Sequence, residues 1–282
     1  MKHNILFIEG LPGSGKTTFA RRLKKHYEQQ GVDVALFNEG DLHPIDLAWC
    51  SYCTKDQFDE IIQRFPNIEE ALRSVTSIED GKYISAYTRV SHPSVTQEFY
   101  DYMEQFEVYR YTDLQRFLDV HIKRWSYFNL HFDPRKLYIF ECILLQNHIT
   151  ELVLNHNASY HDMYQYIETL LQQINNQKPV IYYIKQNNIE RTFHRIIEER
   201  RSDQPDLYRD WIDNVIRYLD TTKYAEELQF TGIEGMIRYG TYRQETECSI
   251  LDDLPVDSHV FEPEEDYDRV FTEMIQKEET NE

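Results

Sequence analysis

The chain has 282 residues and a formal net charge of −19. This acidic balance argues against a protein that binds duplex DNA nonspecifically, because such binding depends on a basic surface that meets phosphates. The sequence contains no apolar span of about 18 residues, and it enters the first predicted strand almost at once, so we expect neither a membrane helix nor a signal peptide. The expected location is therefore cytoplasmic.

The most specific pattern lies near the N-terminus, where residues 10–17 read G-L-P-G-S-G-K-T and match G-x-x-x-x-G-K-[ST] in full. The apolar run at residues 5–8 predicts a buried strand before the loop, and apolar residues at helical spacing predict a helix after it. Glycines let such a loop curl until its backbone N–H groups point at phosphate oxygens. The alternative, a glycine-rich turn before an ordinary helix, is disfavoured because the motif is complete and has its required context.

The motif assigns roles to individual side chains of the loop. Lys16 would reach the β- and γ-phosphates of a nucleotide, and the hydroxyl of Thr17 would ligate a magnesium ion. The predicted cofactors are therefore ATP and Mg²⁺, with the choice between ATP and GTP left open. The residues expected to hold the phosphates are Gly10, Gly13, Ser14, Gly15, Lys16, Thr17 and Thr18.

A second predicted strand covers residues 32–37 and is followed by acidic side chains. In open α/β sheets the ligand binds beyond the carboxyl ends of the strands, which is where Glu39 and Asp41 stand. Either carboxylate could accept the proton of an acceptor hydroxyl or orient the acceptor. The alternative is that Asp41 caps the next segment and that Glu39 is solvated.

Residues 45–134 carry no strong signal for a parallel strand, and most of them read as helix. Apolar positions at helical spacing indicate amphipathic helices near residues 58–65, 99–106 and 114–128. Between the first two, Asp80-Gly81 indicates a turn in an irregular or hairpin-like stretch. We predict a helical insertion that forms the acceptor region. Its cationic candidates for binding a polar or anionic acceptor, with a plain surface role as the alternative, are Arg89, Arg116, Lys123 and Arg124.

The cysteines suggest reduced thiols rather than a disulfide framework, because only four occur in a chain of this length. Cys50 and Cys53 form C-x-x-C. No second pair and no nearby histidine couple completes a zinc site, so a metal or redox role is disfavoured.

A third predicted strand covers residues 137–142, and its apolar run ends in Glu141. Glu141 has the position of a carboxylate that binds the magnesium ion of a glycine-rich phosphate loop, directly or through water. A helix-capping role is the alternative. Helices are predicted at residues 149–154 and 160–175, and a fourth strand at residues 178–184. Strands that alternate with helices in this way predict a parallel sheet covered on both faces.

The segment after the fourth strand predicts a helix rich in arginine. Arg191 and Arg195 lie one turn apart on one face of it, and their guanidinium groups suit phosphate oxygens. We interpret them as a clamp on the transferring phosphoryl group, within a lid over residues 186–206 that ends in the turn-prone residues 202–205. A salt-bridged helix is the alternative, because glutamates alternate with the arginines.

The rest of the chain predicts a helix at residues 207–219, a loop or hairpin at 231–242, a short fifth strand at 258–261 and a closing helix at 267–275. The predicted fold class is therefore α/β, with a parallel sheet between helical layers. We treat residues 1–282 as one domain with a helical insertion at 45–134.

The order of these motifs resembles that of the P-loop nucleoside and nucleotide kinases, with a layout close to thymidylate kinase and the deoxynucleoside kinases. The pieces that resemble them are G-L-P-G-S-G-K-T-T at 10–18, N-E-G-D at 38–41, I-F-E at 139–141, and Y-I-K leading to R-x-x-x-R at 191–195. The resemblance implies a three-layer P-loop kinase fold with a five-stranded sheet and a Mg-ATP site. It also implies that Glu39 lies near the acceptor hydroxyl and that Arg191 and Arg195 are lid arginines.

These observations lead to one main hypothesis, an ATP-dependent phosphotransferase that acts on a small-molecule acceptor such as a nucleoside, a nucleotide or another hydroxyl compound. A nucleotide-dependent switch or ATPase that signals through the helical insertion is the second hypothesis. A nucleic-acid 5′-kinase is third, and the acidic balance disfavours it. No membrane partner is expected, and a homodimer is left open.

Overall fold

The strand before the glycine-rich loop lies in the middle of a parallel sheet. The computed structural model describes residues 2–110, 112–202, 210–264 and 266–279, and within them five strands pair in the order β2-β6-β1-β7-β8. The strands are β1 (Ile5–Gly10), β2 (Asp33–Phe37), β6 (Lys136–Glu141), β7 (Pro179–Ile184) and β8 (Asp257–Phe261). Every residue of β1 and β7 is buried, which explains why both read as continuous apolar runs. The predicted α/β class with a parallel sheet is confirmed.

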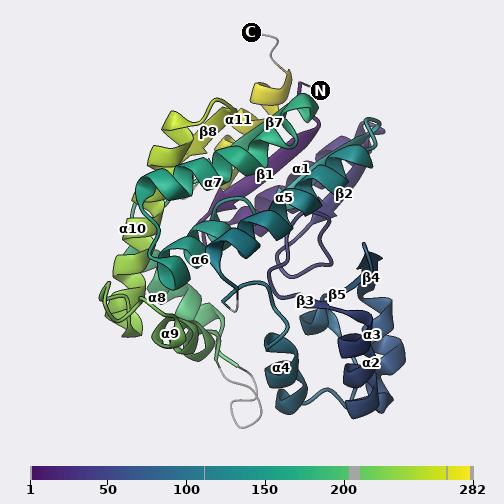
Figure 1. The fold of residues 1–282 in the computed structure, drawn as a ribbon. Helices are drawn as coiled ribbons and strands as arrows, with labels where there is room; N and C mark the ends of the chain where they lie inside the picture. Colours follow the sequence, from purple (N-terminus) through teal and green to yellow (C-terminus); the bar gives the residue numbers. More distant parts are fainter. Residues whose placement is uncertain (1, 111, 203–209, 265, 280–282) are drawn as a thin grey trace. The chain divides into compact units, whose positions relative to one another are not determined.

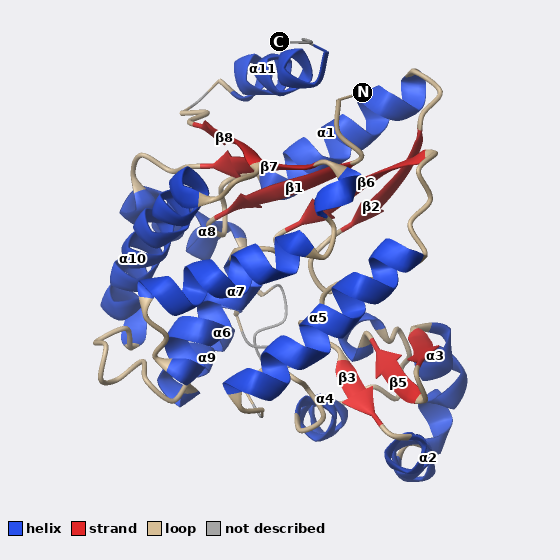
Figure 2. Cartoon of the chain, turned by 45° about the horizontal axis from the view of Figure 1, so that its top comes forward, coloured by secondary structure: helices blue, strands red, loops and turns tan. Residues whose placement is uncertain are grey.

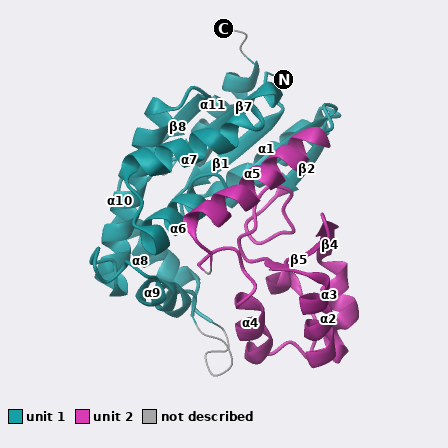
Figure 3. Ribbon diagram, in the orientation of Figure 1, with its two compact units in different colours: residues 1–36, 132–282 teal, residues 37–131 magenta. Residues whose placement is uncertain are grey.

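The chain divides into two compact units (Figure 3). The first comprises residues 1–36 and 132–282 and contains the parallel sheet, and the second comprises residues 37–131. Among the described residues, no helix combines the length and the apolar character needed to cross a lipid bilayer.

Helices accompany the strands of the first unit (Figures 1 and 2). They are α1 (Lys16–Gln29), α6 (Gln146–His156), α7 (Tyr160–Gln172), α8 (Ile189–Glu199), α9 (Trp211–Thr221), α10 (Gly232–Asp253) and α11 (Tyr267–Glu279), with a 3₁₀ turn, η3 (Asn175–Gln177). On one face of the sheet, Leu6 and Ile8 of β1 share a buried cluster with Phe19 of α1 and Met274 of α11. The side chains of Glu9 and Tyr183 point to the other face, toward α6 and α10.

The second unit has its own small sheet and core. Its strands β3 (Ser51–Cys53), β4 (Thr76–Glu79) and β5 (Lys82–Ser85) pair antiparallel in the order β3-β5-β4. Its helices are α2 (Lys55–Arg64), α3 (Glu69–Ser74), α4 (Gln97–Glu104) and α5 (Leu114–Leu130), with the 3₁₀ turns η1 (Pro66–Ile68) and η2 (Tyr87–Arg89). Phe58, Leu72 and Phe99, from three of these helices, lie in one buried cluster. Residues 37–131 therefore bury an apolar core of their own.

The second unit contains a predicted hairpin and a strand that was not predicted. The hairpin around Asp80-Gly81 is confirmed, because β4 and β5 pair across these residues and both have positive φ angles, 47° and 73°. Strand β3 was missed, because three residues are too short for a periodic signal.

The loop or hairpin predicted at residues 231–242 is wrong, because Gly232–Asp253 is one helix. Its glycines allow close packing instead of a turn. A Cβ on Gly235 would lie 2.2 Å from the backbone carbon of Phe230, and one on Gly240 would lie 2.7 Å from the ring of Phe193. These close contacts require glycine even though glycine weakens a helix.

Candidate functional site

The glycine-rich loop is curled so tightly that side chains at its glycines would not fit. Gly10 and Gly13 have φ angles of 139° and 77°, which residues with a side chain rarely adopt. A Cβ on Gly10 would lie 2.5 Å from the carbonyl oxygen of Ile184, and one on Gly13 would lie 2.4 Å from Cγ2 of Ile196. The motif therefore forms a compact turn held between β7 and α8.

The loop has polar groups that suit an anion. The Oγ of Ser14 is buried and has no hydrogen-bond partner among the described residues, which is uncommon for a buried hydroxyl. The backbone N–H of Phe19 donates to the carbonyl oxygen of Gly15, just before α1. The N–H groups of the earlier residues of the helix therefore point to its N-terminus, at the positive end of the helix dipole. A phosphate at this turn would meet both kinds of donor, so the residues present fit the phosphates of a nucleotide.

Lys16 lies folded back over the loop. Its Nζ donates to the carbonyl oxygens of Gly10 and Leu11, at 2.8 Å each, and lies 3.5 Å from Oε1 of Gln146. The side chain is buried. The ammonium group is thus held by neutral oxygens next to the place where the motif requires it.

Thr17 and Glu141, the predicted metal-binding residues, lie in direct contact. The Oγ1 of Thr17 donates to Oε1 of Glu141 at 2.6 Å. Glu141 ends β6, which pairs with β1, so the carboxyl ends of the two strands bring carboxylate and loop to one edge of the sheet. Hydroxyl and carboxylate oxygens are preferred ligands of Mg²⁺, so this pair has suitable donors for that ion.

The arginine helix contacts the loop through one of its two predicted clamp residues. Nη2 of Arg195 donates to the carbonyl oxygen of Gly13 at 2.8 Å. Arg191 is exposed in the first turn of α8, where its backbone N–H donates to the N-cap side chain of Asn188. Part of the salt-bridged alternative is also present, because Arg195 forms an ion pair with Glu199 at 3.8 Å and Arg201 pairs with Glu198 at 2.6 Å. Of the predicted lid, residues 203–206 lie outside the described residues.

Glu39 and Asp41 belong to the second unit, where they lie in a turn that Arg89 contacts. Oδ2 of Asp41 accepts from the backbone N–H of Asn38 at 2.8 Å, and Oδ1 forms an ion pair with Nη2 of Arg89 at 2.9 Å. The same guanidinium donates to the carbonyl oxygens of Glu39 and Gly40. Asp41 therefore stabilises its own turn, and Arg89, an acceptor candidate by sequence, stabilises it from outside.

Arg124, another acceptor candidate, is buried inside the second unit. It forms an ion pair with Glu79 at 2.8 Å and donates to the carbonyl oxygen of His43. Nδ1 of His43 faces the backbone N–H groups of Ile45 and Asp46, and burial lowers the pKa of this imidazole to about 3. These contacts give Arg124 and His43 structural roles.

The cysteine pair is unsuited to act as a metal ligand or a nucleophile. Cys50 and Cys53 are free and buried, and burial raises the pKa of both thiols, to about 11 for Cys53. A metal ligand or nucleophile needs the thiolate, which this environment disfavours.

Two polar residues around the loop, Glu9 and Arg243, were missed by the sequence interpretation. Glu9 is fully buried and accepts the backbone N–H groups of Leu144 at 2.7 Å and Gln146 at 3.2 Å, at the N-terminus of α6. Burial raises the pKa of Glu9 to about 7. Arg243 of α10, although far from the loop in sequence, also reaches it. No motif identifies either residue, although Glu9 stands out as a carboxylate that interrupts an apolar strand.

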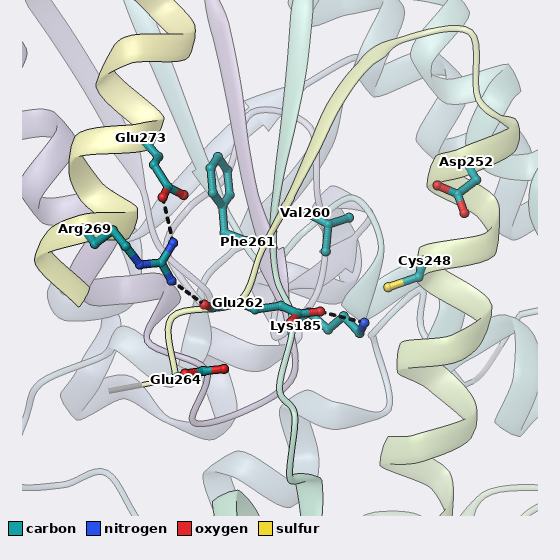
Figure 4. Close-up of a pocket in the computed structure, with 9 residues that line it drawn as sticks. All are labelled: Lys185, Cys248, Asp252, Val260, Phe261, Glu262, Glu264, Arg269 and Glu273. Carbon is teal, nitrogen blue, oxygen red and sulfur yellow. Dashed lines mark hydrogen bonds and ion pairs between the residues drawn. The ribbon is translucent and has the colours of Figure 1, made fainter. Parts of the chain in front are cut away.

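A groove of about 590 Å³ opens beyond the carboxyl ends of β7 and β8 (Figure 4). The residues that line it are Lys185, Cys248, Asp252, Val260, Phe261, Glu262, Glu264, Arg269 and Glu273. Two pairs of its charges neutralise each other, Lys185 with Glu262 at 2.8 Å and Arg269 with Glu273 at 2.7 Å. The predicted site residues are not part of this lining.

Comparison with known proteins gives limited matches. A family model described as "Chromatin associated protein KTI12" matches residues 4–76, which is less than half of the chain. A search of curated proteins gave no match. One similar solved structure, "Crystal structure of APE1195", shares 14% identity over 69% of this chain and 70% of that chain, with a TM-score of 0.30.

The α/β fold with a five-stranded parallel sheet is consistent with the fold of P-loop NTPases. The complete loop motif follows the central strand of a parallel sheet, Glu141 ends the neighbouring strand, and the matched family region includes the loop. The narrower resemblance to thymidylate and deoxynucleoside kinases receives no support from these comparisons.

Proposed function

We propose that this protein is an ATP-dependent phosphotransferase that moves the γ-phosphate of Mg-ATP to an acceptor hydroxyl or phosphate. The contact between Thr17 and Glu141 at 2.6 Å, next to a loop with donors for phosphate, is the observation that supports it best. A magnesium ion at these oxygens would offset the charge of the phosphates during transfer.

In the first unit, different residues would bind the phosphates and stabilise the charge of the transferring phosphoryl group. Lys16 would exchange its carbonyl partners, Gly10 and Leu11, for phosphate oxygens. Arg195 already contacts the loop at Gly13, so its guanidinium needs little movement to face a transferring phosphoryl group. Arg191, one turn earlier, is the second candidate for this role. Such positioned charges are what phosphoryl transfer requires, because the protein forms no covalent bond in it.

The acceptor side of the proposal depends on the second unit. Glu39 and Asp41 remain the candidates for the carboxylate that engages the acceptor hydroxyl. Asp41 forms an ion pair with Arg89, so this role would require Asp41 to exchange that partner for the acceptor. We propose a small-molecule acceptor, such as a nucleoside, a nucleotide or another hydroxyl compound.

One observation favours a second function, a nucleotide-dependent switch or ATPase. Arg89 and Arg124, which the sequence offered for binding an acceptor, stabilise the second unit internally. A unit built in this way could transmit nucleotide state to a partner without binding a phosphate acceptor. This alternative predicts release of inorganic phosphate and no phosphorylated product.

The test is transfer of phosphate from γ-labelled ATP to pooled acceptors, with protein variants run in parallel. Lys16→Ala should abolish turnover while the unfolding transition stays near that of the wild type. Lys25→Ala, which changes an exposed lysine of the same helix, is the matched control and should keep full turnover. Glu141→Gln should raise the Mg²⁺ concentration needed for half-maximal turnover.

The outcomes separate the hypotheses. Labelled acceptor supports the phosphotransferase, and labelled inorganic phosphate alone supports the switch. Turnover that is unchanged in Lys16→Ala would overturn both.

A further inference from the structure

Two cations approach the same pair of oxygens behind the glycine-rich loop. Nη2 of Arg243 lies 3.2 Å from Oε1 of Gln146 and 3.4 Å from the carbonyl oxygen of Gly10. Nζ of Lys16 donates to the same carbonyl at 2.8 Å and lies 3.5 Å from the same amide oxygen. The carbonyl and the amide are therefore shared between the motif lysine and an arginine from α10, more than 200 residues later in the chain.

The guanidinium of Arg243 is fixed from behind. Its Nε forms an ion pair with Oε1 of Glu247 at 3.0 Å, one helical turn further along α10. Oε2 of Glu247 accepts the hydroxyl of Tyr183 from β7 at 2.6 Å. Arg243, Glu247 and Tyr183 are all buried, so the sheet and α10 together hold this cation beneath the loop. Glu247, which Tyr183 holds through its hydroxyl, thus anchors the guanidinium of Arg243.

We propose, resting on the proposed function, that Arg243 is a positioning residue that allows Lys16 to leave the loop for the phosphates. When Lys16 turns to phosphate oxygens, the carbonyl of Gly10 and the amide of Gln146 lose a donor. Arg243 keeps both of these oxygens hydrogen bonded, so of the acceptors that Lys16 leaves only the carbonyl of Leu11 loses the donor described above. Without Arg243 the same two oxygens have a stronger hold on Lys16, and phosphate must compete with them.

A purely structural role for Arg243 makes a different prediction. If the guanidinium only joins α10 to the sheet through Glu247, its loss lowers stability, and any effect on nucleotide binding does not depend on Gln146. The proposed role requires such dependence, because Gln146 is one of the two oxygens through which Arg243 and Lys16 compete. A double-mutant cycle separates the two.

The experiment measures ATP affinity by calorimetry, together with the unfolding midpoint of the nucleotide-free protein. Arg243→Met with Glu247→Met removes both charges of the ion pair, which avoids a buried carboxylate without its partner. We expect ATP affinity to fall about tenfold in this variant. In a Gln146→Met background the same pair of changes should lower affinity by no more than about threefold.

Three further results decide the matter. Arg243→Lys should recover part of the lost affinity, because a lysine retains a charged donor but lacks the fork that reaches both oxygens. Equal losses with and without Gln146→Met would overturn the proposal and leave Arg243 a structural residue. If wild-type protein and Lys16→Ala bind ATP equally, the proposed function itself fails. If the wild type binds ATP and the Arg243 variant binds it as well, only the role of Arg243 is overturned.

Discussion

Replacing Glu9 with glutamine tests whether the carboxyl group beneath the glycine-rich loop is protonated near neutral pH. The side chain is fully buried at the N-terminus of α6, and burial raises its pKa from 4.5 to about 7. The unfolded chain ionises first as the pH rises, so the protonated Glu9 stabilises the fold below pH 4.5, and this contribution is lost as the pH rises through 7. Glutamine has no such titration.

The size of the effect follows from the two pKa values. One pKa unit corresponds to about 1.4 kcal/mol, so the difference between 4.5 and about 7 amounts to roughly 3 kcal/mol, of which about 2 kcal/mol falls between pH 5.5 and 8.5. Glutamine offers one acceptor oxygen where Glu9 accepts two N–H groups, and the lost hydrogen bond costs about 1 kcal/mol. We therefore expect the two proteins to be about equally stable at pH 5.5 and Glu9→Gln to be about 2 kcal/mol more stable at pH 8.5.

Urea unfolding at several pH values between these limits measures the difference. The range stays above the sequence pI of about 5.0, where an uncharged protein tends to precipitate. Glu227→Gln, a change at an exposed glutamate, is the control and should leave the pH dependence as in the wild type. If the stabilities of Glu9→Gln and the wild type stay a constant amount apart at all pH values, Glu9 titrates normally and the reasoning is refuted.

Two other substitutions test packing, one at the glycine-rich loop and one in the core between the sheet and α11. Gly13→Ala places a methyl group 2.4 Å from Cγ2 of Ile196 at a φ of 77°, so we expect about 3 kcal/mol of destabilisation and loss of ATP binding, whereas Gly31→Ala, at a φ of 81° with open space around it, should cost about 1 kcal/mol. Equal losses for the two glycines in urea unfolding would contradict the close contact with α8. Tyr182→Phe removes the hydroxyl that donates to the buried carboxylate of Glu278 at 2.7 Å, which should lower stability by about 2 kcal/mol; an unchanged unfolding midpoint would show that this hydrogen bond contributes little.

The sheet and the loop could be predicted because their signals are local. Buried parallel strands are short apolar runs, and β1, β6 and β7 each read as one. The pairing of Thr17 with Glu141 followed from a general rule, since carboxyl ends of neighbouring parallel strands share an edge. The roles of these two residues in binding a metal ion stay predictions.

The residues behind the loop could not be predicted, because their positions depend on tertiary contacts. Gly235 and Gly240 favour a turn by local propensity, yet both lie in a long helix, where Gly240 packs against Phe193 of α8. With residues 231–242 predicted as a loop or hairpin, no pattern brings Arg243, the next residue, to the loop at Gly10. An isolated arginine in an acidic chain gives no signal of its own.

The packing of α8 restricts how the predicted lid could close. Phe193 and Ile196 are buried on its inner face, Ile196 against Gly13 of the loop and Phe193 against Gly240 of α10. Moving the whole helix away would expose both side chains, at about 2 kcal/mol or more for each. Closure by rigid movement of α8 would therefore need about 4 kcal/mol from binding. The exposed face carries Arg195, whose side chain can exchange the carbonyl of Gly13 for a phosphate without disturbing this packing. We infer that any closure uses the arginine side chains, while the body of α8 stays in place.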